Sequence, residues 1–129
     1  MNRHFKPEGY SSVSPYLIVK DAQRVIDFLA AVFDAAELRR YDRPDGSIMH
    51  VEVRLDDTVI MLGEGDDTVS ASASVVHVYV PDVDTAYQRA LETGGTAIQE
   101  PMQREDDPDR RGMVRDPEGN LWAIATRSE

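Results

Sequence analysis

Two segments of the chain share one arrangement of apolar and polar positions. In each, an apolar stretch ends in a valine, an aspartate follows two positions later, and apolar residues then recur three and four positions apart. The valines are Val19 and Val80 and the aspartates are Asp21 and Asp82, so both pairs have the same offset (80 − 19 = 61 and 82 − 21 = 61). A strand followed by an amphipathic helix produces this pattern, with the aspartate as helix N-cap. The repeat therefore predicts two copies of one supersecondary unit rather than a solenoid, which needs three or more repeats.

In the first half, the pattern predicts a strand over residues 15–19, a helix after Asp21, and three further strands over residues 37–41, 47–55 and 58–62. Asp45-Gly46 predicts a type I′ hairpin turn, and Asp56-Asp57 a second turn. The helix should bury one stripe: Ala22, Val25, Ile26, Leu29, Val32 and Phe33. Alternation over residues 47–55 assigns one set of side chains to the face that covers this helix: Met49, Val51, Val53 and Leu55. The other set should face a pocket or solvent: His50, Glu52 and Arg54.

The second half repeats the scheme. We expect a strand over residues 75–80, a helix over residues 83–93 that stops at Gly94-Gly95, and a short strand over residues 96–99. Residues 100–111 are highly charged and are interpreted as a loop that could contain a short edge strand, and residues 112–115 and 121–126 as a closing hairpin. The polar segments at residues 1–13 and 64–74 predict an N-terminal arm and a linker. The modules are then residues 14–63 and 75–129, forming one compact domain over residues 14–129.

Composition narrows the possible partners and location. The 129 residues are 41% hydrophobic, contain no cysteine, and include no apolar run approaching the roughly 20 residues of a membrane span. The first residues lack the apolar core of a secretory signal, so we expect a cytoplasmic protein that does not enter the membrane. The formal net charge of −10 argues against nucleic acid as a partner and is compatible with a groove for cationic ligands.

The repeat, its spacing and the segment from Asp116 to Trp122, which has the form DPxGxxW, together resemble the vicinal-oxygen-chelate superfamily. This superfamily includes glyoxalase I, extradiol dioxygenases, fosfomycin-resistance enzymes and bleomycin-resistance proteins, and the sequence is most similar to its glyoxalase-like subgroup. The resemblance implies an α+β fold of two βαβββ modules, with curved mixed sheets that form a central pocket. It also implies that the metal ligands of metal-dependent members would fall at four positions: Ser14, Met61, Val75 and Ala123. None suits the usual divalent ions, which prefer imidazole or carboxylate ligands, so we expect no metal cofactor.

The same positions mark the pocket face, because side chains on a strand alternate between faces. The expected pocket residues are Tyr16, His50, Glu52, Met61, His77, Tyr79 and Ala123. His77 is the candidate catalytic residue, as a general base or hydrogen-bond donor, or else it is a structural histidine bonded to Glu52 or a tyrosine. Tyr16 and Tyr79 are interpreted as pocket walls or acids, Trp122 as core, and Arg110 and Arg111 as part of a solvated loop or an anion clamp.

Two functions remain open at this point. The first is a glyoxalase-like small-molecule-binding protein that sequesters a small organic ligand, with a cationic ligand as one option, as resistance-type members do. The second is a lyase, isomerase or dioxygenase that uses a divalent metal held by shifted ligands (His50, Glu52 and His77) or metal-free acid–base chemistry through His77. The resemblance further implies a homodimer with the pocket near the subunit interface.

Overall fold

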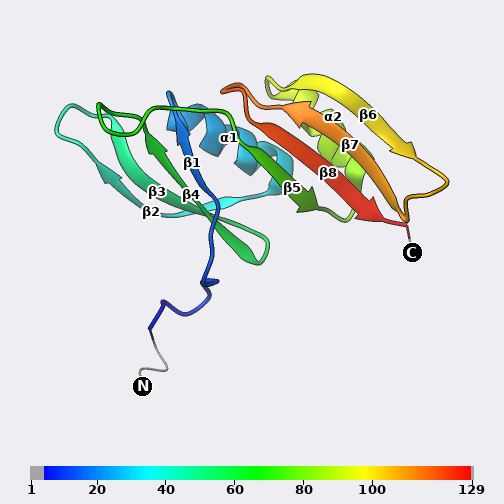
Figure 1. Cartoon of the computed structure of the whole chain (residues 1–129), viewed down its shortest axis with the longest axis horizontal. Helices are drawn as coiled ribbons and strands as arrows, with labels where there is room; N and C mark the ends of the chain where they lie inside the picture. Colours follow the sequence, from blue (N-terminus) through cyan, green and yellow to red (C-terminus); the bar gives the residue numbers. More distant parts are fainter. Residues whose placement is uncertain (1–4, 129) are drawn as a thin grey trace.

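The computed structural model describes residues 5–128, and within them the chain forms two helices and eight strands (Figure 1). The first half contains β1 (Tyr16–Val19), α1 (Ala22–Phe33), β2 (Ala36–Asp42), β3 (Ile48–Leu55) and β4 (Thr58–Glu64). The second half contains β5 (Val75–Tyr79), α2 (Val83–Glu92), β6 (Thr96–Gln103), β7 (Asp109–Arg115) and β8 (Leu121–Arg127). The order βαβββ therefore occurs twice, which confirms the predicted α+β class and its two modules.

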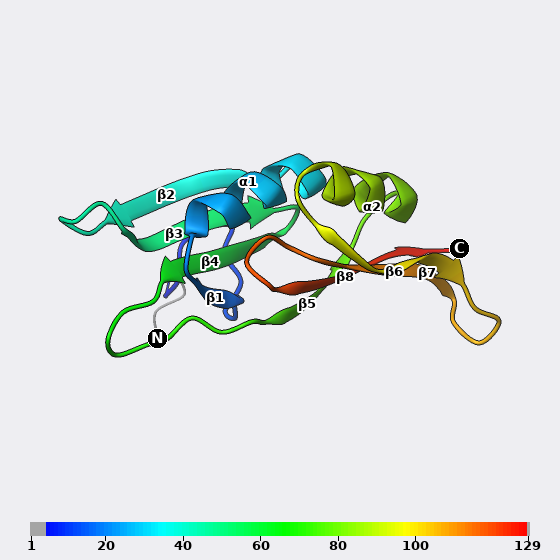
Figure 2. The same ribbon diagram turned by 90° about the horizontal axis from the view of Figure 1, so that it is seen from above.

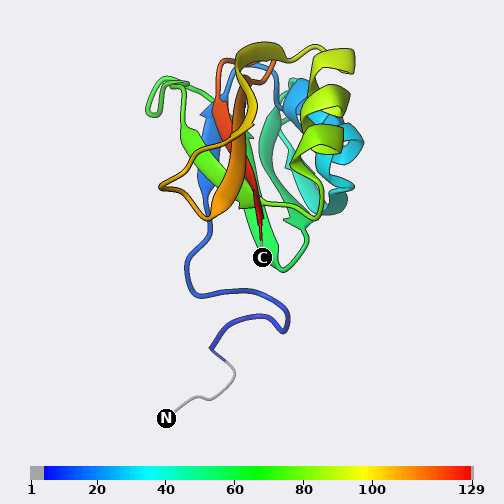
Figure 3. The same ribbon diagram turned by 90° about the vertical axis from the view of Figure 1, so that its right-hand side faces the viewer.

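Each module forms one four-stranded mixed sheet. The strand orders are β1-β4-β3-β2 and β5-β8-β7-β6, with β1 parallel to β4 and β5 parallel to β8, and antiparallel pairing elsewhere. The two helices contact each other and lie on the same side of the sheets (Figures 2 and 3). Each sheet therefore has one face toward a helix and one without a helix, which we call its open face. Neither helix of the described chain combines the length and apolar content needed to cross a bilayer.

Aspartates begin both helices, as the sequence predicts. The carboxylate of Asp21 accepts from the backbone N–H of Arg24, and that of Asp82 accepts from Asp84 and Thr85. Each satisfies N–H groups that have no partner within the first helical turn and places negative charge at the positive end of the helix dipole.

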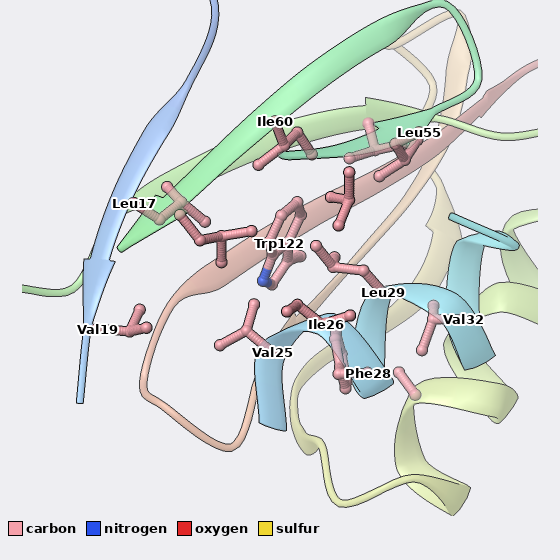
Figure 4. Close-up of a cluster of buried hydrophobic side chains, with 14 of the residues drawn as sticks. Leu17, Val19, Val25, Ile26, Phe28, Leu29, Val32, Leu55, Ile60 and Trp122 are labelled. Atoms are coloured by element: carbon pink, nitrogen blue, oxygen red, sulfur yellow. The ribbon is translucent and has the colours of Figure 1, made fainter. Parts of the chain in front are cut away.

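The core is shared between the two modules. Trp122 of β8 is fully buried among side chains of β1, β3, β4 and α1, and its ring lies 5.7 Å from that of Phe33 (Figure 4). This confirms the predicted core role of Trp122. The structure also buries Phe28, which lies outside the predicted helical stripe: a Cβ added at Gly95, after α2, would lie only 3.1 Å from its ring. Helix α1 therefore packs against both its own sheet and the second module.

The DPxGxxW segment has a structural role. Asp116 is buried and accepts from the backbone of Glu118 and Asn120, the Asn120 side chain and the indole N–H of Trp122. Glu118 in turn accepts from the backbone N–H groups of Lys20 and Asp21. This turn of the second module therefore helps to hold the start of α1 in the first.

Two predicted details of the β2–β3 hairpin are wrong. Gly46 has a positive φ of 91° but Asp45 does not, and the Gly46 N–H donates to the Arg43 carbonyl, so the turn is not type I′. In β3, Ile48 is buried and Met49 is 49% exposed, although Met49 was expected to cover the helix. Tyr41 pairs with His50 and Asp42 with Ile48, which leaves Met49 as the extra residue of a β-bulge and reverses its face.

The charged segment at residues 100–111 is mostly strand rather than loop. β6 continues to Gln103 and β7 begins at Asp109, so the connection is short. Arg111 pairs with Met102 on one side and with Ala125 on the other. Arg110 and Arg111 therefore lie in the sheet. Backbone hydrogen bonds to the neighbouring strands hold them there, although the charged composition of the segment favours a loop.

Of the predicted N-terminal arm, residues 1–4 lie outside the described residues. The remainder runs past the open face of the first sheet. Tyr10 donates a hydrogen bond to Glu52, and the Gly9 carbonyl accepts one from Arg54. The arm thus contributes a side chain to this face.

Candidate functional site

The open face of the first sheet carries most of the predicted pocket residues of that half. Tyr16 pairs with Met61 and Met61 pairs with Glu52, so the three side chains lie in one row across β1, β4 and β3. The alternate residues of these strands belong to the core: Leu17, Leu62, Val51 and Val53. The period of two thus places the row on the side away from α1.

Glu52 is the centre of a hydrogen-bond network on this face. Its side chain is only 4% exposed, and one carboxylate oxygen accepts from Tyr10 and from Arg39 Nε at 2.9 Å, while the other lies 2.8 Å from His50 Nε2. Burial alone would raise the pKa of the carboxyl, but hydrogen bonds from Tyr10, His50 and Arg39 outweigh it and lower the pKa of Glu52 to about 2. The hydrogen bond to Glu52, together with burial, raises the pKa of Tyr10. Glu52 is therefore a carboxylate at neutral pH, and Tyr10 is a protonated donor to it.

His50 connects this carboxylate to a phenol at the surface. Its Nδ1 lies 2.8 Å from the Tyr16 hydroxyl, and its ring stands between two tyrosine rings, with centroid distances of 5.4 Å to Tyr16 and 6.2 Å to Tyr41. Because both ring nitrogens have partners, the orientation of the imidazole is fixed. The structure thus brings Tyr16, His50 and Glu52 together, as a chain that leads from the surface to the interior.

The second sheet carries a network centred on an arginine. His77 pairs with Ala123, and Arg111 pairs with Ala125, which also pairs with Tyr79. Arg111 Nη1 lies 2.6 Å from His77 Nε2, and its other nitrogens donate to Asp107 and Asp109. A guanidinium has no acceptor, so His77 Nε2 is the acceptor in this contact and Nδ1 carries the hydrogen. In this arrangement His77 can donate, whereas a role as base would require Arg111 to move.

Asp109 lies beneath this network and is 2% exposed. Its Oδ2 accepts from the Tyr79 hydroxyl at 2.6 Å and from Arg111, and the bond to Asp109 raises the pKa of Tyr79. Its Oδ1 has no hydrogen-bond partner within residues 5–128, and Arg127 Nε is 3.9 Å away. Tyr79 is thus held by its hydroxyl while its ring stays exposed.

A cavity of about 310 Å³ lies between the modules, where the β3–β4 hairpin meets β5. His77 and Tyr79 line it together with Asp56 and Asp57 of the hairpin turn, and most of the remaining wall is apolar. Its volume is at the small end of the roughly 300–1,000 Å³ typical of ligand pockets.

Apolar side chains are exposed around both networks. Residues that pair across neighbouring strands point to the same face of a sheet. Five large apolar residues on the open faces are exposed, and each pairs with another residue of its face: Tyr16 with Met61, Tyr41 with His50, Val75 with Leu121, Tyr79 with Ala125 and Met102 with Arg111. Val75 has the highest exposure of these, at 70%.

The residues at the implied metal positions do not fit a divalent ion. Met61 and Ala123 lie at equivalent places in the two sheets, since Met61 pairs with Tyr16 and Ala123 with His77, but a thioether and a methyl group are poor or impossible ligands for such ions. Within residues 5–128, no group of three or more His, Cys, Asp or Glu side chains could hold a metal ion. His50 and Glu52 lie together, but His77 is bonded to Arg111 and does not join them.

The sequence did not identify four members of these networks: Tyr10, Arg39, Asp109 and, as a partner of His77, Arg111. Tyr10 and Glu52 are 42 positions apart, and Arg39 reaches Glu52 only through the β2–β3 register. For Arg111, the offset of 61 from His50 was an available signal (111 − 50 = 61). The loop expected from the charged composition of residues 100–111 hides this equivalence.

The sequence matches a family model and relatives from two mycobacterial species. Residues 9–124 match the family model of the Glyoxalase/Bleomycin resistance protein/Dioxygenase superfamily. Uncharacterized proteins of Mycobacterium bovis and Mycobacterium tuberculosis are 35% identical over 126 residues, with 88% of this chain covered and 81% and 72% of those chains.

Solved structures show the same fold. TioX from a Micromonospora species superposes with a TM-score of 0.74 and 28% identity, covering 91% of this chain and 98% of that one. TnmS3, an antibiotic binding protein from a Streptomyces species, superposes with a TM-score of 0.69 and 21% identity, covering 92% and 100%.

Proposed function

The chain belongs to the Glyoxalase/Bleomycin resistance protein/Dioxygenase superfamily, and on this basis we propose that it binds a small, largely apolar organic molecule on its open faces. In this proposal the protein does not use the metal site of metal-dependent members, because Ser14, Met61, Val75 and Ala123 supply neither imidazole nor carboxylate. Sequestration of the ligand, as in resistance-type members, is the function that this arrangement supports best.

The observation that carries the proposal is the exposure of aromatic and aliphatic side chains on strands of both open faces. Soluble proteins seldom leave contiguous apolar surface bare unless it binds something. Here Tyr16, Tyr79 and Val75 are each about half exposed or more, next to hydroxyl, imidazole and guanidinium groups that already have partners within the protein. Such a surface offers contact area with a few fixed polar groups, which is the composition of a small-molecule site.

A positive charge on the ligand is favoured by the charge of the protein. The formal net charge is −10, and Asp56 and Asp57 line the cavity beside His77 and Tyr79. A surface of one sign raises the local concentration of ligands with the opposite sign. We therefore assign the ligand to the class of planar or bulky apolar molecules with a cationic group.

A second copy of this chain would enclose the ligand more fully. The cavity within one protomer is small, and the exposed apolar residues continue beyond it over both sheets. A homodimer that covers the open faces would bury this surface and enlarge the pocket, and we include it in the proposal.

The test uses three probes that share one aromatic frame: 9-aminoacridine, which is cationic, acridone, which is neutral, and acridine-9-carboxylate, which is anionic. Binding to the full chain is measured by calorimetry and fluorescence, and the mass of the assembly by light scattering. We expect the cation to bind best and Val75→Asn to weaken it about tenfold, since losing the burial of one valine costs about 1.5 kcal/mol. Val69→Asn, at an exposed valine in the connection between β4 and β5, is the matched control and should leave affinity unchanged.

A dimer that binds the cation with the expected effect of Val75→Asn supports the proposal. If none of the three probes binds below millimolar concentration, or if Val69→Asn weakens binding as much as Val75→Asn, the open faces are not the ligand site.

A further inference from the structure

We propose that Tyr16, His50 and Glu52 form a metal-independent proton relay that takes a proton from a C–H group of an organic molecule bound on the open face of the first sheet. The proposal rests on ligand binding at this face and goes beyond it, because it assigns a chemical step to a surface that sequestration would leave passive. The catalytic residue is Tyr16, and His50 and Glu52 act through it.

The direction of the hydrogen bonds follows from the partners of Glu52. Arg39 can only donate, and the Tyr10 hydroxyl donates to the same oxygen, so the carboxylate is an acceptor toward His50 as well. A neutral His50 therefore carries its hydrogen on Nε2, and the lone pair of Nδ1 faces the Tyr16 hydroxyl at 2.8 Å. The Tyr16 O–H then donates to His50. This is the arrangement of a catalytic triad, in which a histidine receives the proton of a nucleophile or base and a carboxylate orients the histidine. Here these groups are Tyr16, His50 and Glu52.

The relay has a closed end and an open end. Glu52 is 3% exposed and is fixed by residues from three parts of the chain, whereas Tyr16 is 48% exposed. A ligand on the open face can therefore reach the phenol oxygen but not the carboxylate. The gradient of burial agrees with proton movement from the surface toward an anion held inside.

The path from Tyr16 to His50 depends on a position without a side chain. A Cβ added at Gly63 would lie 3.5 Å from the Tyr16 hydroxyl and 2.8 Å from the Met49 carbonyl. Glycine at this place on β4 lets the phenol lie across the strand and reach β3. The bulge at Met49 and the bare backbone at Gly63 together shape the contact.

The second module cannot perform the same step, although it has the same layout. The offset of 61 places His77 at the position of Tyr16, Arg111 at that of His50 and Met113 at that of Glu52 (16 + 61 = 77, 50 + 61 = 111, 52 + 61 = 113). A guanidinium keeps its protons and a thioether is no anion. The acceptor chain is thus specific to the first sheet.

In the proposed step, the Tyr16 oxygen takes a proton from the ligand while its own proton passes to His50 Nδ1. The electron pair of the broken bond stays on the ligand, and the imidazolium that forms is stabilised by the Glu52 carboxylate. Returning the proton to another atom of the ligand gives an isomer, and loss of an internal leaving group gives an elimination product. No oxidant or reductant is required. The substrate class is a planar carbon acid, because the Tyr16 and Tyr41 rings flank His50 with centroids within about 6 Å.

The test uses 5-nitrobenzisoxazole, a neutral planar molecule in which removal of the C–H proton breaks the ring N–O bond and releases a coloured phenolate. The rate of phenolate release is measured with a chelator present for the full chain and for three variants, Tyr16→Phe, His50→Ala and Tyr87→Phe. The last variant makes the same chemical change on α2 and is the matched control. We expect kcat/KM to fall about 100-fold in the first two variants, within the range of general acid–base effects, and to stay unchanged in the control.

Rescue separates a role in proton transfer from a structural one. Free imidazole should restore part of the activity of His50→Ala, and should restore none when Tyr16→Phe is added to it. No acceleration by the wild-type chain, retention of the rate in Tyr16→Phe, or equal imidazole response in the single and double variants would each overturn the relay. If the probe binds but is not turned over, the relay fails and the binding proposal stands; if the acridines also fail to bind, both fail.

Discussion

The stability of the protein should depend on the ionised state of Glu52. Replacing Glu52 with Gln keeps the size and shape of the side chain but removes the negative charge that Tyr10, His50 and Arg39 surround. The amide also presents a donor where His50 Nε2 already donates. We therefore expect Glu52→Gln to destabilise the chain at neutral pH and to lose most of this effect in acid.

The size of the expected loss in unfolding free energy follows from the lowered pKa of Glu52. The carboxyl of Glu52 titrates at about 2 in the folded protein against 4.5 as the reference, and a difference of about 2.5 units corresponds to about 3 kcal/mol. Arg39 is half exposed, so solvent screening reduces its share and we expect about 2–3 kcal/mol. Because the pKa is lowered on folding, this stabilisation is fully present above about pH 4.5 and is lost as the pH falls toward 2.

The assay is urea unfolding of the wild type and Glu52→Gln at several pH values between 7 and 2, followed by circular dichroism. The quantity compared is the difference in unfolding free energy between the two chains, because carboxyl groups common to both cancel in it. Glu92→Gln, at the exposed end of α2, is the control and should change stability by less than about 0.5 kcal/mol. A difference for Glu52→Gln that stays constant from pH 7 to pH 2 would refute the reasoning.

Two further substitutions test how the modules are joined. Trp122→Phe should cost about 1–3 kcal/mol, since it leaves a small cavity in the shared core and removes a donor from buried Asp116; urea unfolding measures this, and a loss below about 0.5 kcal/mol would contradict the shared core. Glu118→Gln should cost about 1–2 kcal/mol, because the neutral amide accepts more weakly from the Asp21 backbone. It should also speed hydrogen exchange at that N–H, and unchanged exchange would show that the turn does not hold α1.

Much of the fold could be predicted because local rules and the tertiary structure agree. The caps at Asp21 and Asp82, the two strand–helix units and the core position of Trp122 all follow from periodicity and from the repeat. Phe28 shows the limit, because its burial depends on a second module that the helical stripe of α1 cannot reveal.

The charged segment between β6 and β7 illustrates another limit. Its acidic and basic residues favour a loop by composition, yet Arg111 is in a central strand where Asp107 and Asp109 satisfy its guanidinium. Pairing across the sheet decides the structure there, and a single sequence does not contain that information in local form. For the same reason the sequence placed Glu52 on the right face of β3 but could not predict its burial, which requires Tyr10 from the arm and Arg39 from β2.

The two open faces show how a duplicated unit can hold two different chemistries. In both sheets the first strand and the third strand contact each other across the last: Tyr16 with His50 in one, His77 with Arg111 in the other. The first pair ends in an anion and leaves an acceptor nitrogen beside a phenol, whereas the second ends in a cation that occupies the histidine nitrogen. A ligand held between such faces would meet, on one side, a chain that can accept a proton through His50 and, on the other, a histidine whose acceptor nitrogen is already occupied by Arg111. If the protein acts on its ligand, the part of the ligand that loses a proton should therefore face the first sheet.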